Sequence, residues 1–161
     1  MRFFRSGLLS RVVVLACMIA SVALFVLSAT GIAFLALLPP APAQTGAQLV
    51  WGRDFNSSLN QARTSRKYVL VDFYTDWCTW CKRLDNETYA HPTVVTYLNR
   101  GFVCLKLNAE DGGQGQQLAN RYNVNAFPCT VVLDATGRQR GLFYGFRQPA
   151  PFIQEIQDIL R

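Results

Sequence analysis

Apolar residues are concentrated in two parts of the chain that differ in pattern. From Val12 to Leu38 the sequence is almost continuously apolar, and no charged residue occurs between Arg11 and Arg53. After that point, short apolar runs alternate with polar stretches. The first pattern is typical of a segment that enters a membrane, and the second is typical of a folded domain.

The second part predicts alternating strands and helices. Residues 68–74 and 102–107 are apolar with little alternation, as expected for strands buried on both faces, and 68–74 is predicted to be the central strand. A short strand at 49–51 and a hairpin formed by 130–133 and 139–144 complete the predicted strands. Helical spacing predicts helices from Phe55, after Cys78 as far as His91-Pro92, at 94–98, around Leu118 to Tyr122, and from Phe152 to Leu160. The order βαβαββα predicts a three-layer α/β domain.

Composition and charge exclude two broad classes of protein. Half of the residues are hydrophobic and 16% are charged, which argues against intrinsic disorder. The net charge of +6 includes Arg2, Arg5 and Arg11, all of which precede the apolar segment. The other 13 basic residues are scattered among 10 acidic ones, whereas a nucleic-acid binder would cluster them on one element. We therefore expect no nucleic-acid partner.

The N-terminal segment has two interpretations, a retained membrane anchor and a cleaved signal sequence. Ala41-Pro42-Ala43 has the form of a signal-peptide cleavage site. The apolar run of 27 residues is longer than a signal-peptide core, however, and as a helix it would span about 40 Å, more than the roughly 30 Å of a bilayer core. A retained anchor is therefore favoured.

Either interpretation places the folded domain outside the cytoplasm, because a basic N-terminal flank stays on the cytoplasmic side. The predicted organisation is a cytoplasmic flank at 1–11, an anchor or signal segment at 12–38, a Pro/Ala-rich linker at 39–48 and a domain at 49–161. We expect a periplasmic domain held at the inner membrane through Val12 to Leu38.

Cys78-Thr79-Trp80-Cys81 follows the predicted central strand and begins a predicted helix. Over one helical turn, this spacing allows both sulfurs to face each other, with Cys78 at the exposed end. The partial positive charge of the helix N-terminus would stabilise a Cys78 thiolate, so Cys78 is predicted to attack and Cys81 to resolve the mixed disulfide. A zinc half-site and a purely structural disulfide are the alternatives, but zinc would need a second pair of ligands.

The remaining cysteines have less specific surroundings. Cys17 lies inside the apolar segment and is interpreted as a membrane-buried thiol rather than a lipid-attachment site. Cys104 and Cys129 fall in predicted strands, where a buried packing thiol is the common case.

The stretch from Val71 to Lys82, which contains the two cysteines, resembles the active-site segment of thioredoxins. Asn125-Ala126-Phe127-Pro128 resembles their later proline loop. The resemblance covers the whole predicted domain and implies a thioredoxin-like fold with a central mixed sheet. The continuation from Arg83 to Leu98 most resembles the C-terminal periplasmic domain of DsbD-type thiol:disulfide interchange proteins.

The resemblance implies a role for several residues. Pro128 is expected to form a cis peptide bond facing the active site, with the backbone of Phe127 pairing with an extended substrate. Asp72 and Lys106 match a buried acid and its lysine partner near the resolving cysteine. An acid in so apolar a strand should have a raised pKa and could accept the Cys81 proton, unless it points to solvent at a strand edge.

Other positions are aromatic or depart from the family pattern. Trp77 and Trp80 are expected to frame the site or to pack against its helix. Thr79-Trp80 replaces the Gly-Pro pair of thioredoxins, which leaves the direction of electron flow open. Cys129 replaces the usual threonine after the proline, so a third redox thiol is an alternative to a packing role. The implied sheet order disfavours a bridge between Cys104 and Cys129.

These observations predict a thiol:disulfide oxidoreductase that acts on disulfide-containing proteins, as a reductase rather than an oxidase. A reductase outside the cytoplasm needs electrons, so a membrane electron donor such as a DsbD-like reductase is implied as partner. Neither a cofactor nor a metal ion is expected. An oxidase or isomerase and a non-catalytic interaction module remain the alternative functions.

Overall fold

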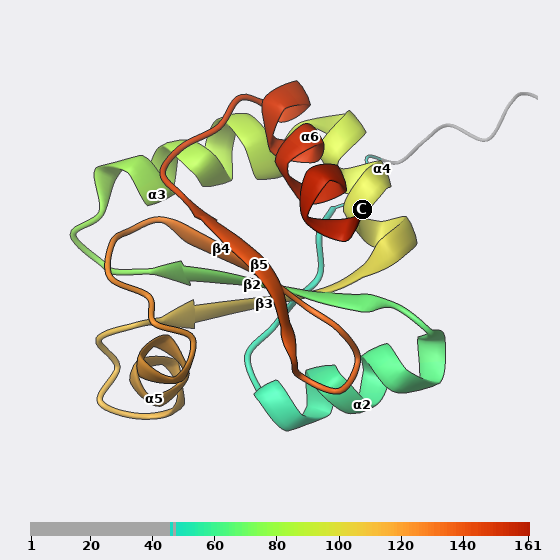
Figure 1. The fold of residues 1–161 in the computed structure, drawn as a ribbon. Helices are drawn as coiled ribbons and strands as arrows, with labels where there is room; N and C mark the ends of the chain where they lie inside the picture. Colours follow the sequence, from blue (N-terminus) through green and yellow to red (C-terminus); the bar gives the residue numbers. More distant parts are fainter. Residues whose placement is uncertain (1–45, 47) are drawn as a thin grey trace, which may run out of the picture. The chain divides into compact units, whose positions relative to one another are not determined.

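The computed structural model describes residue 46 and residues 48–161, which lie in one compact unit from Thr45 to Arg161 (Figure 1). The five strands are β1 (Trp51–Gly52), β2 (Tyr68–Tyr74), β3 (Phe102–Asn108), β4 (Cys129–Leu133) and β5 (Gln139–Tyr144). The helices are α2 (Phe55–Ser65), α3 (Thr79–Leu84), the π-helix η1 (Asp85–Tyr89), α4 (Pro92–Gly101), α5 (Gln114–Arg121) and α6 (Pro149–Leu160). The predicted segment 12–38 and Cys17 lie outside the described residues.

The strands form one mixed sheet in the order β1-β3-β2-β4-β5. Strands β1, β3 and β2 are parallel, whereas β4 runs antiparallel to β2 and β5 antiparallel to β4. The central position of β2 agrees with its prediction from the apolar run. Its place between β3 and β4 also separates Cys104 from Cys129, and both are free thiols.

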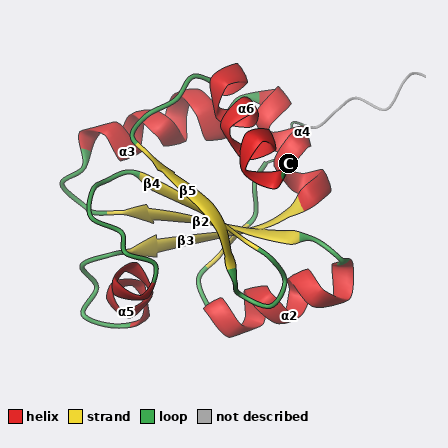
Figure 2. Ribbon diagram, in the orientation of Figure 1, coloured by secondary structure: helices red, strands yellow, loops and turns green. Residues whose placement is uncertain are grey.

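Helices cover both faces of the sheet and produce two hydrophobic cores (Figure 2). Alternation along β2 sends Val69, Val71 and Phe73 to the face covered by α2 and α5. Leu70 points to the opposite face, which is covered by α3, η1, α4 and α6. Asp72 shares the parity of Leu70 and therefore points toward the helix that carries Cys81.

The predicted helix between Cys78 and Pro92 is present, but it changes type along its length. Helix α3 continues directly into η1, in which the N–H of Ala90 donates to the carbonyl of Asp85 at 3.1 Å, five residues earlier. Helix α4 then begins with Pro92, whose missing N–H is tolerated in a first turn. The predicted strand at 49–51 is shifted to Trp51–Gly52, because only these residues pair with β3.

Within the described part of the chain, no helix is both long and apolar enough to cross a membrane.

Candidate active site

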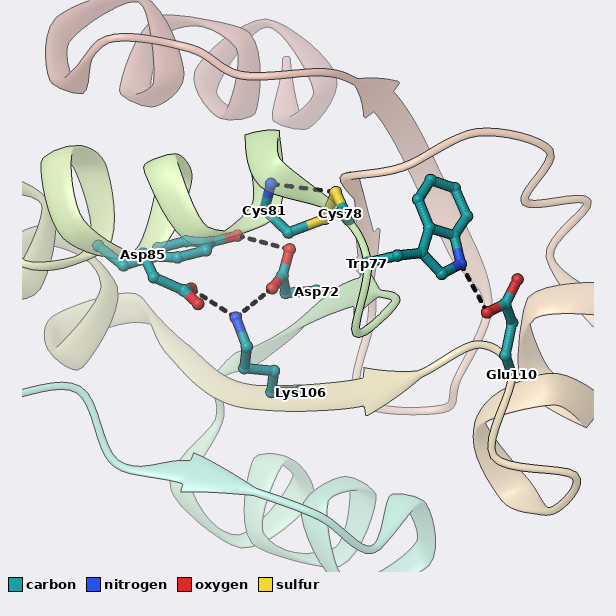
Figure 3. The surroundings of a disulfide bond; sticks show 8 residues. Asp72, Trp77, Cys78, Cys81, Asp85, Lys106 and Glu110 are labelled. Carbon is teal, nitrogen blue, oxygen red and sulfur yellow. Dashed lines mark hydrogen bonds and ion pairs between the residues drawn. A yellow bond between two sulfur atoms is a disulfide. The ribbon is translucent and has the colours of Figure 1, made fainter.

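Cys78 and Cys81 form a disulfide with a Cα–Cα distance of 5.3 Å (Figure 3). Cys78 is the N-cap of α3, and its sulfur accepts the backbone N–H of Cys81 at 3.1 Å. A sulfur in this position faces the free N–H groups and partial positive charge of a helix start, which favour the thiolate once the disulfide is reduced. This position at the helix start favours Cys78 as the attacking sulfur, a role that stays a prediction.

The burial of Cys78 differs from the prediction. Its exposed fraction is 4%, close to the 3% of Cys81, although the sequence predicts that Cys78 lies at the exposed end. The Cys78 sulfur is bonded to Cys81 and accepts the backbone N–H of that residue, so it lies against the first turn of α3. A substrate disulfide must therefore reach the sulfur between the side chains that surround it.

Trp77 and Trp80, which adjoin the two cysteines in the chain, are both exposed. Trp77 is 67% exposed and donates its Nε1–H to the Glu110 carboxylate at 2.8 Å (Figure 3). Its ring also meets the Phe127 ring edge to face. Trp80 is 55% exposed and lies 6.2 Å from the Phe146 ring, centroid to centroid. These rings form two aromatic walls on the surface beside the cysteines.

Arg83 joins the second wall to α3 and η1. Its guanidinium carbon lies 4.4 Å from the Phe146 centroid and 5.4 Å from the Trp80 centroid, within the range of cation–π attraction. Its Nε is 2.6 Å from a carboxylate oxygen of Glu87. Arg83 therefore contacts both rings of this wall, and the Glu87 carboxylate offsets part of its positive charge.

The peptide bond between Phe127 and Pro128 is cis, as the resemblance implies. The carbonyl of Pro128 accepts the N–H of Gly145 at 2.8 Å, which ties the proline loop to the segment that carries Phe146. Thr79, the first residue of α3, is exposed.

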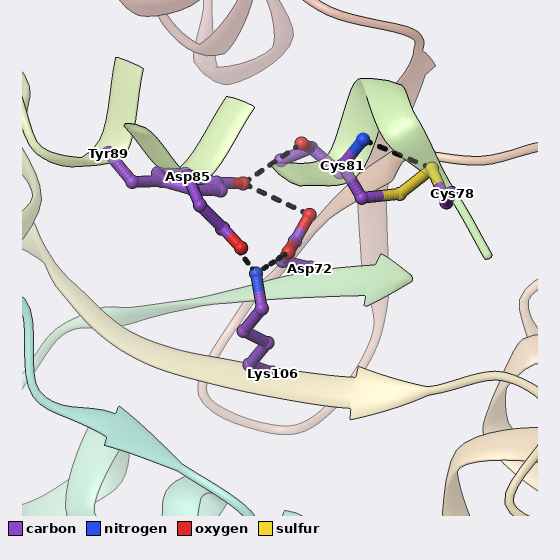
Figure 4. A network of polar contacts seen from close by, with 7 residues as sticks. Asp72, Cys78, Cys81, Asp85, Tyr89 and Lys106 are labelled. Atoms are coloured by element: carbon purple, nitrogen blue, oxygen red, sulfur yellow. Dashed lines mark hydrogen bonds and ion pairs between the residues drawn. A yellow bond between two sulfur atoms is a disulfide. The ribbon is translucent and has the colours of Figure 1, made fainter. Parts of the chain in front are cut away.

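A buried ionic network lies beneath the disulfide (Figure 4). Asp72 is 1% exposed, so the alternative of a solvent-facing acid is wrong. One carboxylate oxygen accepts from Lys106 Nζ at 2.7 Å, and the other accepts from the Tyr89 hydroxyl at 3.2 Å. Lys106 Nζ also lies 2.5 Å from a carboxylate oxygen of Asp85, which is 39% exposed.

Burial dominates the electrostatics of this network. Desolvation raises the pKa of Asp72 above its ordinary value, although the adjacent Lys106 ammonium acts to lower it. Burial acts to lower the pKa of Lys106, but the carboxylates of Asp72 and Asp85 together outweigh it, so that pKa is raised. Asp72 is thus an acid that takes up a proton more readily than a surface aspartate, which agrees with the prediction from its apolar strand.

The two free thiols are poor candidates for redox chemistry. Burial raises the pKa of both Cys104 and Cys129 to about 12, so neither forms a thiolate at neutral pH. Cys129 is fully buried in the core on the α2 face, opposite to Cys81. A packing role is therefore favoured for both.

A pocket of about 400 Å³ opens beside the network and is lined by Trp51, Asp85, Tyr89 and Lys106, among others. Among the residues that the structure describes, no group of three or more His, Cys, Asp and Glu side chains is arranged to hold a metal ion.

A family model described as a thioredoxin-like domain matches residues 55–160, which include every element from α2 to α6. The chain belongs to the thioredoxin-like family. Its membership accounts for the sheet order around β2, the two cysteines at the start of α3 and the proline loop before β4. Together with the Cys78–Cys81 disulfide, it supports thiol:disulfide oxidoreductase chemistry.

Three known proteins show which members of the family this thioredoxin-like chain resembles. The thiol:disulfide interchange protein DsbD of Vibrio vulnificus is 32% identical over 109 residues, which are 66% of this chain and 18% of the relative. The chain therefore matches less than a fifth of that protein's length. A thioredoxin from Thermus thermophilus is 26% identical and has a TM-score of 0.62. This match covers 70% of the present chain and 88% of the thioredoxin chain. The C-terminal domain of Neisseria meningitidis DsbD, 23% identical, has the same fold with a TM-score of 0.55 over 68% of this chain and 98% of its own.

The thioredoxin-like fold brings together most of the residues predicted from the sequence. Asp72 and Lys106 pair across neighbouring strands, and Phe127 and Pro128 lie in the loop beside Trp77. Four further residues of the site were not predicted from the sequence: Arg83, Asp85, Tyr89 and Glu110. Asp85 and Tyr89 follow Cys78 by seven and eleven residues, a spacing that places them on the helix after the cysteines. No other feature of the sequence distinguishes them from other residues of that helix.

Proposed function

We propose that this chain is a membrane-anchored, extracytoplasmic thiol:disulfide oxidoreductase that reduces disulfides in other proteins. The observation that carries the proposal is the Cys78–Cys81 disulfide at the start of α3, placed above the buried Asp72. The extracytoplasmic location rests on the basic flank and apolar segment before the domain, and on the DsbD relatives.

Reduction of a substrate begins from the dithiol form of the protein. The Cys78 thiolate attacks one sulfur of the substrate disulfide, forms a mixed disulfide and releases the other substrate sulfur as a thiolate. Cys81 then loses its proton, and its sulfur attacks Cys78. This step releases the second substrate thiolate and leaves the Cys78–Cys81 disulfide, so two electrons pass to the substrate.

Asp72 is the proposed base in the second step. Cys81 is buried and needs an acceptor for its proton, and Asp72 points toward the helix that carries it (Figures 3 and 4). The raised pKa of Asp72, caused by burial, brings it nearer to that of a thiol, so the proton transfer is less uphill. Proton removal from Cys81 speeds resolution of the mixed disulfide, the step that completes substrate reduction.

The remaining residues would bind and orient the substrate. The backbone at Phe127, before the cis Pro128, would pair with an extended substrate segment. The aromatic walls of Trp77 and Trp80 would contact its side chains on either side of the sulfur, with Thr79 between them in sequence. A dithiol in a partner membrane reductase, such as a DsbD-like protein, would regenerate the reduced form.

Disulfide reduction in an insulin-type assay, with a chemical dithiol as electron source, tests the activity. We expect Cys78→Ser to abolish turnover and Cys81→Ser to stop at a mixed disulfide. Cys104→Ala is the matched control, because it removes a buried thiol outside the disulfide. Equal activity of the wild type and Cys78→Ser would favour a non-catalytic interaction module.

The reduction potential of the cysteine pair tests the direction. A value nearer to about −270 mV, typical of reducing dithiols, supports a reductase, whereas a value near about −120 mV supports an oxidase. Trapping with Cys81→Ser in the native compartment should hold both substrates and electron donor as mixed disulfides. Recovery of cytoplasmic proteins alone would contradict the proposed location.

A further inference from the structure

Asp72 has polar neighbours on both sides within the sheet. In the register of the strands, Lys106 of β3 and Thr130 of β4 lie directly opposite Asp72. Directly opposite residues point to the same face, so the three side chains form a polar row across a sheet that is otherwise apolar there. Helix η1 covers the row and places the Tyr89 hydroxyl against it (Figure 4).

The two oxygens of Asp72 have different partners. Oδ2 faces the Lys106 ammonium at 2.7 Å, and Oδ1 faces the Tyr89 hydroxyl at 3.2 Å. An ammonium group has only donors, so a proton on Oδ2 would have no acceptor there. A hydroxyl can donate or accept. A proton taken up by Asp72 therefore belongs on Oδ1, on the side of Tyr89.

Thr130 gives Tyr89 a second partner. The oxygens of the two hydroxyls are 3.4 Å apart, and either can be the donor. When Asp72 is ionised, Tyr89 donates to Oδ1 and accepts from Thr130. When Oδ1 is protonated, Tyr89 accepts from it and donates to Thr130. Tyr89 and Thr130 are 4% and 2% exposed, so this exchange takes place away from bulk solvent.

We propose that Tyr89, oriented by Thr130, is a positioning residue that directs the proton of Cys81 to Oδ1 of Asp72 and stabilises the acid in both protonation states. The inference rests on the proposed function, in which Asp72 is the base. The Cys81 S–H bond breaks and an O–H bond forms at Oδ1. The electron pair left on sulfur then attacks Cys78 and displaces the substrate thiolate.

Other groups around Asp72 affect its titration but not the choice of oxygen. Lys106 holds Oδ2, and Asp85 pairs with the same ammonium group. The negative charge of Asp85 also acts to raise the pKa of Asp72. The titratable and charged groups on the same side of the sheet as Asp72 are Lys106 and Cys104 of β3, Asp85 and Tyr89 of η1, and the Cys78–Cys81 disulfide at α3. Cys129 of β4 lies on the opposite face of the sheet.

Titration of Asp72 in the oxidised protein, followed by carboxyl carbon NMR, tests the inference without any turnover. The bond from Tyr89 to an ionised acid is stronger than the bond that replaces it when the acid is neutral. Tyr89→Phe, which removes only the hydroxyl, should therefore raise the pKa of Asp72 by about one unit, a tenfold gain in proton affinity.

Thr130 acts only through Tyr89, and this gives a second measurement. Thr130→Val should raise the same pKa by a smaller amount, Thr130→Ser should restore it, and the double variant with Tyr89→Phe should match Tyr89→Phe alone. Tyr97→Phe is the matched control, because Tyr97 packs against the same core from α4 without contacting Asp72, and it should change nothing.

An unchanged Asp72 pKa in Tyr89→Phe, or additive effects of the two single variants, would overturn the inference. Failure of the proposed function would appear elsewhere, as equal activity of wild type and Cys78→Ser. Where turnover is present, the pH profile for release of the mixed disulfide should shift in Tyr89→Phe by the same amount as the titration.

Discussion

Lys106 interacts with two carboxylates that differ in exposure. Asp72 is 1% exposed and depends on Lys106 for a positive partner, whereas Asp85 is 39% exposed and can be hydrated. Breaking a buried pair leaves an uncompensated charge, but breaking an exposed pair has little effect on stability. The two halves of this network should therefore respond very differently to substitution.

We expect Lys106→Met to lower the free energy of unfolding by about 3 kcal/mol at pH 8, because it leaves the Asp72 carboxylate buried without a counter-charge. Burial already raises the pKa of Asp72 above its ordinary value of 3.8. An acid with a raised folded-state pKa is disfavoured once it ionises, so stability falls as the pH rises from about 4 through that pKa. Loss of Lys106 raises the pKa further, so the defect should shrink toward pH 5. Urea unfolding at both pH values measures it.

Asp85→Asn is the matched control for this prediction. It removes the other carboxylate of Lys106 but leaves the buried pair intact, so we expect a change of less than about 1 kcal/mol at either pH. A large effect of Asp85→Asn, or a Lys106→Met defect that does not depend on pH, would contradict the assigned electrostatics.

Asp72→Asn should slow resolution of the mixed disulfide about a hundredfold at neutral pH, since it removes the proposed acceptor for the Cys81 proton. Stopped-flow measurement of substrate thiol release, after rapid formation of the mixed disulfide at Cys78, isolates this step. The difference from wild type should narrow at alkaline pH, where hydroxide can deprotonate Cys81. An unchanged rate at neutral pH would remove the role of Asp72.

Three residues of the site, the two cysteines and Asp72, could be recognised from the sequence. Cys78 and Cys81 form a local motif, and Asp72 stands out as the one charge in an apolar strand. Tyr89 does not stand out, because an aromatic residue on a helix is normally part of the core. Thr130 contacts Tyr89 across 41 positions of sequence, a distance that only the sheet register bridges.

At the scale of elements, the π-helix η1 determines which side chains reach the network. The sequence predicts one helix from Cys78 to Pro92, and this is correct for its extent. The i→i+5 bond between Asp85 and Ala90 widens the last turn, which the apolar spacing does not indicate. Asp85 and Tyr89 lie at the two ends of this turn, and both face the polar row of the sheet.

The start of α5 packs unusually close to the end of β3. A Cβ atom on Gly115 would lie 1.9 Å from the carbonyl oxygen of Asn108, a distance that requires the helix and strand to separate. The contact fixes the loop between them, which carries Glu110 and its bond to Trp77. The absence of a side chain at Gly115 thus connects helix packing to one aromatic wall of the site.

We expect Gly115→Ala to lower the free energy of unfolding by more than about 3 kcal/mol, as overpacking against backbone does. Gly101→Ala, in the last turn of α4, is the matched control, because no atom lies within 4 Å of its added Cβ. It should be neutral or stabilising by up to about 1 kcal/mol. Denaturant unfolding measures the free energy of unfolding of both variants. Equal stability of the two would show that the close approach to Asn108 is relieved without loss of stability.

At the scale of the whole molecule, residues Thr45 to Arg161 form a compact unit. Among the residues that the structure describes, the strands, both helical layers and the disulfide lie between Trp51 and Arg161. The alternation of strands and helices was predictable because each apolar run has a length and spacing typical of its element. The bounds of β1 were less predictable, because this strand has only two residues, Trp51 and Gly52, which pair with β3. Val50, in the predicted strand, is 84% exposed.

Removal of the residues before Thr45 tests the role of the N-terminal segment. A fragment beginning at Thr45 should be soluble, unfold cooperatively and retain disulfide reductase activity, because it keeps both cores and the site. The full chain should instead remain with the membrane fraction after alkaline extraction, since 27 consecutive and largely apolar residues at 12–38 are sufficient to span a bilayer. Cell fractionation followed by immunoblotting of both forms compares their distribution.

Recovery of the full-length polypeptide in the membrane supports a retained anchor. A mature chain that begins near Gln44 and appears in the soluble extracytoplasmic fraction would establish cleavage instead, and the domain would then need its electron donor to bind it without the advantage of a shared membrane.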